Sequence, residues 1–214
     1  MHKVKQLMMA LKWQRQVRAA LSTQLSLLED PTVFALGGMT DEEERKISAL
    51  VRECVSSFVK EVKAGPIVEF GTLFGLTTKL LAAEAVNCTP VLTIDNFCWN
   101  PFGLPPALHE AFTRKILRAE LSSGHVQLCV CDSASFRREY RGARPAMVFL
   151  DADHSYEAVR DEIAWARGLG VPLICGHDYG NPRFGVTRAV DAAFPEGVEV
   201  QGMVWVKRVN TEAR

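Results

Sequence analysis

Acidic residues end or follow five short apolar runs of the sequence: Glu69, Asp95, Asp132, Asp151 and Asp178. Two histidines, His154 and His177, lie within three residues of the last two acids. Carboxylates bind cations and accept hydrogen bonds from hydroxyl groups, and imidazole exchanges protons near neutral pH. These residues are therefore the first candidates for binding and catalysis.

The elements that carry these residues follow an alternating pattern. The apolar runs PIVEF, PVLTID, VQLCVCD, AMVFLDAD and VPLICGHD alternate with helical patterns at about 75–87, 107–122 and 155–168. Continuous apolar strands separated by helices indicate a parallel sheet covered on both faces. The tail GVEVQGMVWVKRV predicts two further strands joined by a turn at Gln201-Gly202.

The expected fold class is α/β. It is a doubly wound, Rossmann-like, mostly parallel sheet of seven strands, with an antiparallel C-terminal hairpin and with N-terminal helices. In open sheets of this kind, ligands bind beyond the carboxyl ends of the strands. All five acids should therefore meet at one rim of the sheet.

The N-terminal part of the chain predicts two helices. Residues 2–28 are rich in Leu, Ala and Gln without Gly or Pro, which is typical of an amphipathic helix. Thr40 followed by Glu43 fits a capping box, so a second helix should run from Asp41 to about Lys63. The apolar stripe of the first helix has nothing in its own segment to cover it, and we expect a homodimer.

Composition and charge exclude several classes of protein. The 25 basic and 25 acidic side chains give a formal net charge of zero, which argues against nucleic acid as a partner. No apolar segment is long enough to span a membrane. Six cysteines without a C-x-x-C pair indicate reduced thiols and a cytoplasmic location. We divide the chain into an N-terminal helical extension (1–64, a lid or dimerisation element) and a ligand-binding domain (65–214).

The stretch IVEFGTLFGLTTKLL joins the first strand to a helix through Gly71 and Gly75. Glycine lets a loop backbone pass close to a bound molecule, and the following helix offers free N–H groups. The G-x-x-x-G spacing differs from the G-x-G-x-x-G of dinucleotide sites. Glu69 would repel a pyrophosphate but suits a ligand with an ammonium group. The alternative is a tight structural turn.

Asp95 ends the second predicted strand, followed by Asn96. A carboxylate at this position accepts hydrogen bonds from the ribose hydroxyls of a nucleoside. The alternative is that Asp95-Asn96 opens a turn, a common role of both residue types. Together with the acid and glycines before it, Asp95 favours the nucleoside interpretation.

Five segments resemble motifs of the class I S-adenosylmethionine-dependent methyltransferases, in the branch that includes macrocin-type O-methyltransferases. They are VEFGTLFGLTT, VLTIDNF, VCDSASF, MVFLDADHSYEAVRDEI and LICGHDYGNPRFGVTRAVDAAF. The resemblance covers about Gly65 to the C-terminus. It implies S-adenosylmethionine as cofactor and methyl transfer to a hydroxyl group of a small metabolite or sugar.

The resemblance also implies residue roles. Glu69, Gly71 and Gly75 would line the methionine part, Asp95 would hold the ribose, and Asp132 with Ser133 would flank the adenine or, alternatively, cap a helix. The full set of implied cofactor-binding residues is Glu69, Gly71, Thr72, Gly75, Asp95, Asn96, Asp132 and Ser133.

Metal-dependent relatives bind Mg²⁺ through an Asp after the fourth strand and an acidic pair after the fifth. The matching residues here are Asp151, His177 and Asp178, with His177 in the place of an acid. Imidazole suits Mn²⁺ better than Mg²⁺. We expect either ion at this site, and the alternative is that no metal binds.

His154 starts a predicted helix on the same rim, where a neutral imidazole can take a proton from a hydroxyl group. The catalytic residues expected are Asp151, His154 and Asp178. Capping of the helix by Asp153 or Ser155, with a structural His154, is the alternative. Two other functions stay open: a nicotinamide-dependent oxidoreductase, and a protein that binds the cofactor without catalysis.

Overall fold

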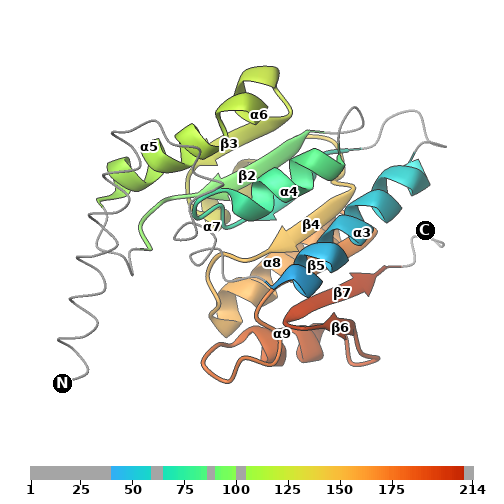
Figure 1. Cartoon of the computed structure of the whole chain (residues 1–214). Helices are drawn as coiled ribbons and strands as arrows, with labels where there is room; N and C mark the ends of the chain where they lie inside the picture. Colours follow the sequence, from blue (N-terminus) through green and yellow to red (C-terminus); the bar gives the residue numbers. More distant parts are fainter. Residues whose placement is uncertain (1–39, 59–64, 86–89, 100–104, 210–214) are drawn as a thin grey trace.

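Seven strands form one sheet in the part of the chain that the structure, a computed structural model, describes: residues 40–58, 65–85, 90–99 and 105–209. The strand order is β3-β2-β1-β4-β5-β7-β6 (Figure 1). The helix expected over 2–28, and the homodimer contact inferred from it, lie outside the described residues.

Five strands run parallel, and the two C-terminal strands form an antiparallel hairpin beside β5. The strands are β1 (Ile67–Phe70), β2 (Val91–Asp95), β3 (Val126–Val130), β4 (Met147–Leu150), β5 (Leu173–Gly176), β6 (Glu199–Gln201) and β7 (Val204–Arg208). The fold class predicted from the sequence is confirmed. The hairpin turn differs by one residue: Gln201 pairs with Val204, so the turn is Gly202-Met203.

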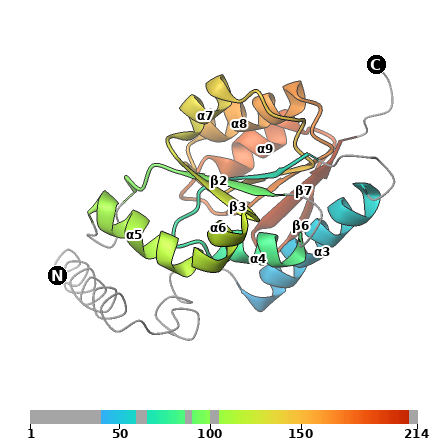
Figure 2. The same cartoon turned by 90° about the horizontal axis from the view of Figure 1, so that it is seen from above.

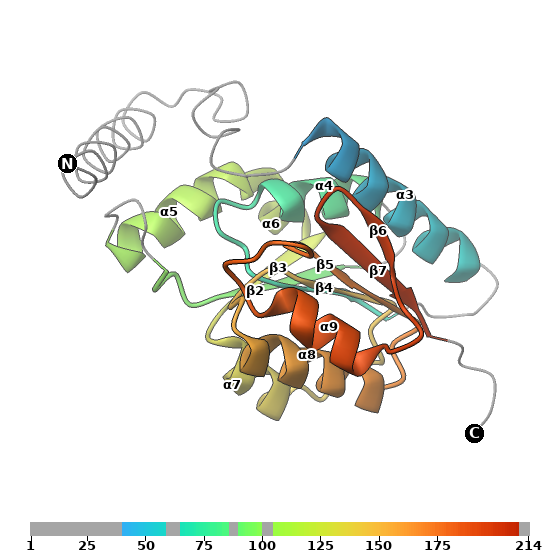
Figure 3. The same ribbon diagram turned by 90° about the horizontal axis from the view of Figure 1, so that it is seen from below.

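Helices cover both faces of the sheet, as a doubly wound fold requires (Figures 2 and 3). One face carries α3 (Asp41–Phe58), α4 (Leu76–Glu84), α5 (Pro106–Ile116) and α6 (Arg118–Ser123). The other carries α7 (Ser133–Glu139), α8 (Tyr156–Gly168) and α9 (Val186–Ala193). The single helix expected over 107–122 is two helices that meet at Leu117. Within the described ranges, no helix has the length and apolarity needed to cross a membrane.

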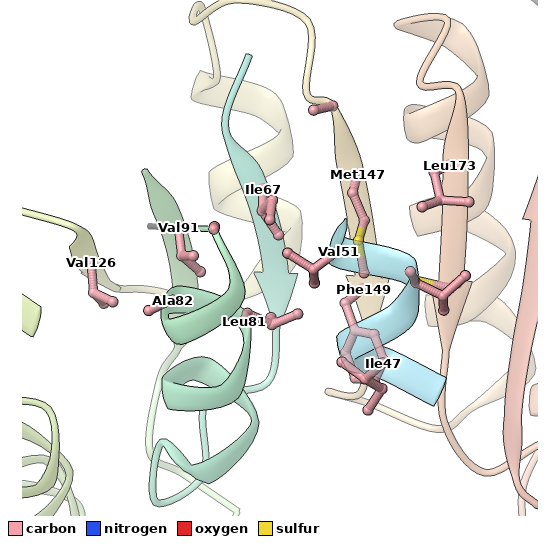
Figure 4. Packing of buried hydrophobic residues seen from close by; sticks show 14 of the residues in the cluster. Ile47, Val51, Ile67, Leu81, Ala82, Val91, Val126, Met147, Phe149 and Leu173 are labelled. Carbon is pink, nitrogen blue, oxygen red and sulfur yellow. The ribbon is translucent and has the colours of Figure 1, made fainter. Parts of the chain in front are cut away.

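Helix α3 contributes to the main hydrophobic core. Ile47, Leu50 and Val51 are at most 1% exposed and belong to the same buried cluster as Phe149 of β4. Figure 4 shows Ile47 and Val51 close to Phe149. The burial of this apolar face therefore joins α3 to the sheet. The division of the chain after residue 64 stays a prediction.

The capping box at the start of α3 is confirmed. The Thr40 amide donates to Glu43 Oε2 at 2.8 Å, and the Glu43 amide donates to Thr40 Oγ1 at 3.3 Å. The other carboxylate oxygen of Glu43 accepts from the Met203 amide at 2.7 Å. This one side chain therefore caps α3 and ties it to the β6–β7 hairpin.

We predict that Leu50→Ala lowers the free energy of unfolding by about 2–5 kcal/mol, because the substitution leaves a cavity in the core. Arg45→Ala on the exposed side of α3 is the matched control and should change it by less than about 0.5 kcal/mol. Urea unfolding followed by circular dichroism measures both. Equal stability of the two variants would show that α3 is not part of the core.

Candidate active site

The two glycines of the loop after β1 are required by the protein's own packing. Gly71 has φ 94°, and a Cβ atom there would lie 2.1 Å from the backbone oxygen of Asp151. Gly75 has φ 82°, and its Cβ would lie 2.8 Å from the Leu117 side chain. Both positions combine left-handed backbone with contact distances that exclude a side chain. The structural-turn interpretation therefore accounts for both glycines, while Gly71 also lines a cavity.

Asp95 holds this loop to the end of β2. Its Oδ2 accepts from the amides of Thr72 at 3.0 Å and Leu73 at 2.8 Å, and its Oδ1 accepts from the Phe97 amide at 2.7 Å. Leu73 and Phe97 have φ of 48° and 55°, a conformation that is uncommon for residues with side chains. The three hydrogen bonds stabilise this backbone. Asp95 also lines the cavity, so the turn and ligand roles are compatible.

Glu69 lies beneath the loop and is fully buried. Its Oε2 accepts from Thr78 Oγ1 at 2.5 Å and from Thr93 Oγ1 at 2.6 Å, and its Oε1 has no partner among the described residues. Burial raises the pKa of Glu69 to about 8, although the two threonine hydroxyls oppose the shift. A carboxyl group that is mostly neutral at pH 7 offers little charge to an ammonium group. Glu69 therefore joins β1 to Thr78 of α4 and to Thr93 of β2.

A cavity of about 1130 Å³ extends along the carboxyl ends of the strands. On the β1–β2–β3 side it is lined by Gly71, Asp95, Asn96, Asp132 and Ser133. On the β4–β5–β7 side it is lined by Asp151, His154, His177, Asp178, Phe184 and Met203. The structure thus brings most of the residues selected from the sequence to one cavity. Glu69, Thr72 and Gly75 are not among its lining residues.

The adenine-side candidates also have structural partners. Asp132 is the N-cap of α7 and accepts from the amide and the hydroxyl of Ser135 at 2.7 and 2.9 Å. Ser133 hydrogen-bonds Glu162, a buried carboxyl on α8 whose pKa burial raises to about 7. Asn96 uses its side-chain oxygen in a turn, where the amide two residues later donates to it. The helix-cap role of Asp132 is present, and its carboxylate remains at the cavity wall.

His154 lies between two carboxylates on the other side of the cavity. Its Nε2 is 3.3 Å from Asp151 Oδ1 and 3.5 Å from Asp178 Oδ2, and its ring lies 4.5 Å from that of Phe184. Burial disfavours the charged imidazole, but the two carboxylates outweigh burial and raise the pKa of His154. Ser155 caps α8, as the alternative interpretation expected, and His154 lines the cavity.

Asp151 and Asp178 differ in their surroundings. Burial raises the pKa of Asp151 above its ordinary value. Burial also acts on Asp178, but hydrogen bonds from His177 and Asn181 outweigh it and lower the pKa of Asp178. Asp178 has φ 60°, and Asn181 Nδ2 donates to its Oδ1 at 2.8 Å. Asp178 is therefore the more strongly ionised carboxylate of the pair.

His177 connects the cluster to helix α3. Its Nδ1 is 3.7 Å from Asp178 Oδ2 and 3.9 Å from Asp151 Oδ1, and its Nε2 is 3.4 Å from Glu43 Oε1. Burial opposes the charge, but the three carboxylates raise the pKa of His177 to about 9. The sequence pointed to Glu43 only as a helix cap. No sequence signal placed it beside His177, because only the packing of α3 against the sheet brings them together.

Asp151, His177 and Asp178 each offer one ligand atom, and these atoms lie within 4.8 Å of one another. In an octahedral shell with bonds of about 2.1 Å, neighbouring ligand atoms lie about 3 Å apart and opposite ones about 4 Å apart. The separations of 3.7 and 3.9 Å fall within that range. The three side chains therefore offer donor atoms of the kinds that bind divalent cations, and the imidazole suits Mn²⁺ better than Mg²⁺.

We predict that Glu69→Gln flattens the pH dependence of stability. The folded state binds the Glu69 proton up to about pH 8, whereas the unfolded chain releases it near its ordinary value of 4.5. Wild-type stability should therefore fall as the pH rises from about 5 to 8, by up to about 1 kcal/mol per pH unit from this group. Gln, which mimics the neutral acid, removes that contribution. Parallel slopes for the two proteins in urea unfolding would refute a raised pKa.

Residues 68–179, just over half of the chain, match the family described as Methyltransferase domain. No curated protein matches the chain. Three solved structures are similar over most of their length. An O-methyltransferase from Bacillus cereus, in complex with SAH, has 14% sequence identity and a TM-score of 0.60, over 92% of this chain and 98% of that one.

Cofactor-bound Rv0187 from MTB has 17% identity and a TM-score of 0.58, over 94% of this chain and 88% of that one. The O-methyltransferase TomG from Streptomyces achromogenes, in complex with SAM, has 15% identity and a TM-score of 0.57, over 91% and 86%. At these identities the likeness shows a shared fold. The shared fold and the cavity at the strand ends agree with the family match. The chain belongs to the Methyltransferase domain family and is a class I S-adenosylmethionine-dependent methyltransferase.

Proposed function

We propose that the protein transfers a methyl group from S-adenosylmethionine to a hydroxyl group of a small metabolite or sugar. The proposal rests on one cavity that joins the residues on the β1–β2–β3 side to those on the β4–β5–β7 side. Gly71 and Asp151 come together where the two sides meet, since the backbone oxygen of Asp151 lies against the Cα atom of Gly71. A donor on one side and an acceptor on the other would then react beside Asp151.

The cofactor would lie on the β1–β2–β3 side. Among the described residues, Asp95 Oδ1 accepts one backbone amide, so it can accept a further hydrogen bond from a ribose hydroxyl. Gly71 lines the cavity on this side, and Ser133 at the start of α7 lies where the base would bind. S-adenosylmethionine, when bound, supplies an activated methyl group. The protein's part is to hold it in line with the acceptor oxygen.

The acceptor would lie on the β4–β5–β7 side. Phe184 and Met203 line the cavity there and are 40% and 42% exposed, so they offer apolar walls to a small molecule. The B. cereus and S. achromogenes neighbours carry the name O-methyltransferase, which supports oxygen as the accepting atom.

His154 is the proposed base. In its neutral form the ring carries its proton on Nε2, which lies 3.3 and 3.5 Å from Asp151 and Asp178, and Nδ1 takes the proton of the acceptor hydroxyl. The two carboxylates then stabilise the imidazolium that results. The same carboxylates raise the pKa of His154, which makes it a stronger base. Phe184 packs on the ring and holds its orientation.

A divalent cation is the second way to activate the hydroxyl. Asp151, His177 and Asp178 would hold it, and a bound cation lowers the pKa of a coordinated hydroxyl group. Glu43 would orient His177 from behind, as carboxylates do for metal-binding histidines.

Calorimetric titration with S-adenosylhomocysteine tests the cofactor site. We predict micromolar binding by the wild type and a loss of at least about tenfold in Asp95→Ala, because one hydrogen bond to the ribose and the loop that Asp95 holds are both lost. Circular dichroism controls for folding of the variant. Absence of binding by the wild type, with EDTA and with Mg²⁺ or Mn²⁺, would refute the proposed function.

Asp178→Asn tests the acceptor site. Asn tolerates the φ of 60° but removes the charge, so S-adenosylhomocysteine affinity should be unchanged. The heat of Mn²⁺ binding should disappear, and methyl transfer to a panel of sugars and phenols should fall by about 100-fold or more. Glu139→Gln, an exposed carboxylate on α7, is the control and should keep both. Full transfer by Asp178→Asn would exclude Asp178 from catalysis.

A further inference from the structure

His109 on α5 has a buried nitrogen atom that the fold leaves without a partner. The residue is 2% exposed, and its Nε2 makes no hydrogen bond within the described part of the chain. Its ring lies 4.6 Å from that of Phe74 and 5.1 Å from that of Phe97, which fixes its orientation. Even so, His109 is one of the residues that line the large cavity, on the side of Asp95. A buried polar atom without a partner is uncommon and costs stability.

The other ring nitrogen determines which tautomer is present. His109 hydrogen-bonds the backbone oxygen of Leu73 through its ring. Because Nε2 is the unpartnered atom, Nδ1 carries the proton and donates it to that oxygen. Burial lowers the pKa of His109, so the ring is neutral at pH 7. Nε2 therefore presents a lone pair and can only accept a hydrogen bond.

The hydrogen bonds of Asp95 show why a second acceptor is needed. Each carboxylate oxygen has two lone pairs. Oδ2 already accepts from the amides of Thr72 and Leu73, and Oδ1 accepts from that of Phe97. With respect to the residues that the structure describes, one acceptor position remains, on Oδ1. A ribose presents two adjacent hydroxyl groups. Asp95 can accept a hydrogen bond from one of them, and the other needs a different acceptor.

We propose that His109 Nε2 accepts a hydrogen bond from one ribose hydroxyl of S-adenosylmethionine while Asp95 Oδ1 accepts one from the other. The inference rests on the proposed function and adds a binding residue to it. It also gives the buried nitrogen a partner, which the described residues around it do not provide. His109 thus links the ribose to the loop after β1, since Nδ1 holds Leu73 and Nε2 faces the ligand.

A purely structural role for His109 predicts a different result. Leu73 O accepts from His109 and also from Thr113 Oγ1 at 2.6 Å, so the histidine helps to fix the loop whether or not a ligand binds. His109→Asn separates the two roles. The amide nitrogen of Asn can take the place of Nδ1 and keep the bond to Leu73, but nothing replaces Nε2.

The experiment is calorimetric titration of wild type and His109→Asn with S-adenosylhomocysteine and with its 2′-deoxy and 3′-deoxy analogues. We expect His109→Asn to weaken S-adenosylhomocysteine by roughly tenfold, as for loss of one hydrogen bond. One of the two analogues lacks the hydroxyl group that Nε2 binds. Wild type and His109→Asn should bind that analogue with equal affinity. An equal loss for all three ligands would show a structural role, and no loss for any would show no contact; either overturns the inference.

A measurement on the wild type guards against misfolding of the variant. In ¹⁵N-histidine NMR spectra, the Nε2 signal of His109 should move on addition of S-adenosylhomocysteine and stay in place with the analogue identified above. An unmoved signal with bound S-adenosylhomocysteine would overturn the inference while leaving the proposed function intact. Failure of the wild type to bind S-adenosylhomocysteine would instead refute the proposed function itself.

Discussion

The site depends on the hydrogen bonds that the Asp95 carboxylate accepts from three backbone amides. It holds Thr72 and Leu73 at the end of β1 and Phe97 at the end of β2. Two of these residues have left-handed backbone, so the loops need this carboxylate to keep their shape. Because the same side chain lines the cavity, the protein's own hydrogen bonds hold the β1–β2–β3 side of the cavity in shape, and binding of a ligand there would require less ordering of the protein.

The opposite side of the cavity is organised by charge. Three carboxylates and two imidazoles come from α3 and from the ends of β4 and β5, and each histidine lies close to at least two of the acids. Such a cluster is stable only if protons or a cation balance the acids. Glu43 connects this cluster to α3. Its side chain belongs to the capping box of that helix, accepts a hydrogen bond from the Met203 amide and lies 3.4 Å from His177 Nε2. The cluster of carboxylates and imidazoles is therefore joined to the packing of α3 through one side chain, Glu43.

The sequence predicted the sheet and the rim because both follow from local patterns. Apolar runs define buried strands, and each strand of a parallel sheet delivers its C-terminal residue to the same edge. The roles of single residues were harder to predict. Glu69 was expected at the ligand, and its buried carboxyl group hydrogen-bonds Thr78 and Thr93, while Gly75 makes room for Leu117. The unpartnered nitrogen of His109 could not be predicted, since burial and hydrogen-bond accounting require the packed structure.

A crystal structure of the protein with S-adenosylhomocysteine would test whether one cavity holds a nucleoside cofactor on the β1–β2–β3 side with its reactive end toward Asp151, His154 and Asp178. We expect ribose hydroxyls at hydrogen-bond distance from Asp95 Oδ1 and His109 Nε2, with the sulfur atom directed toward the histidine and carboxylate cluster. Electron density for the ligand at another site, or with its ribose turned away from Asp95, would contradict it.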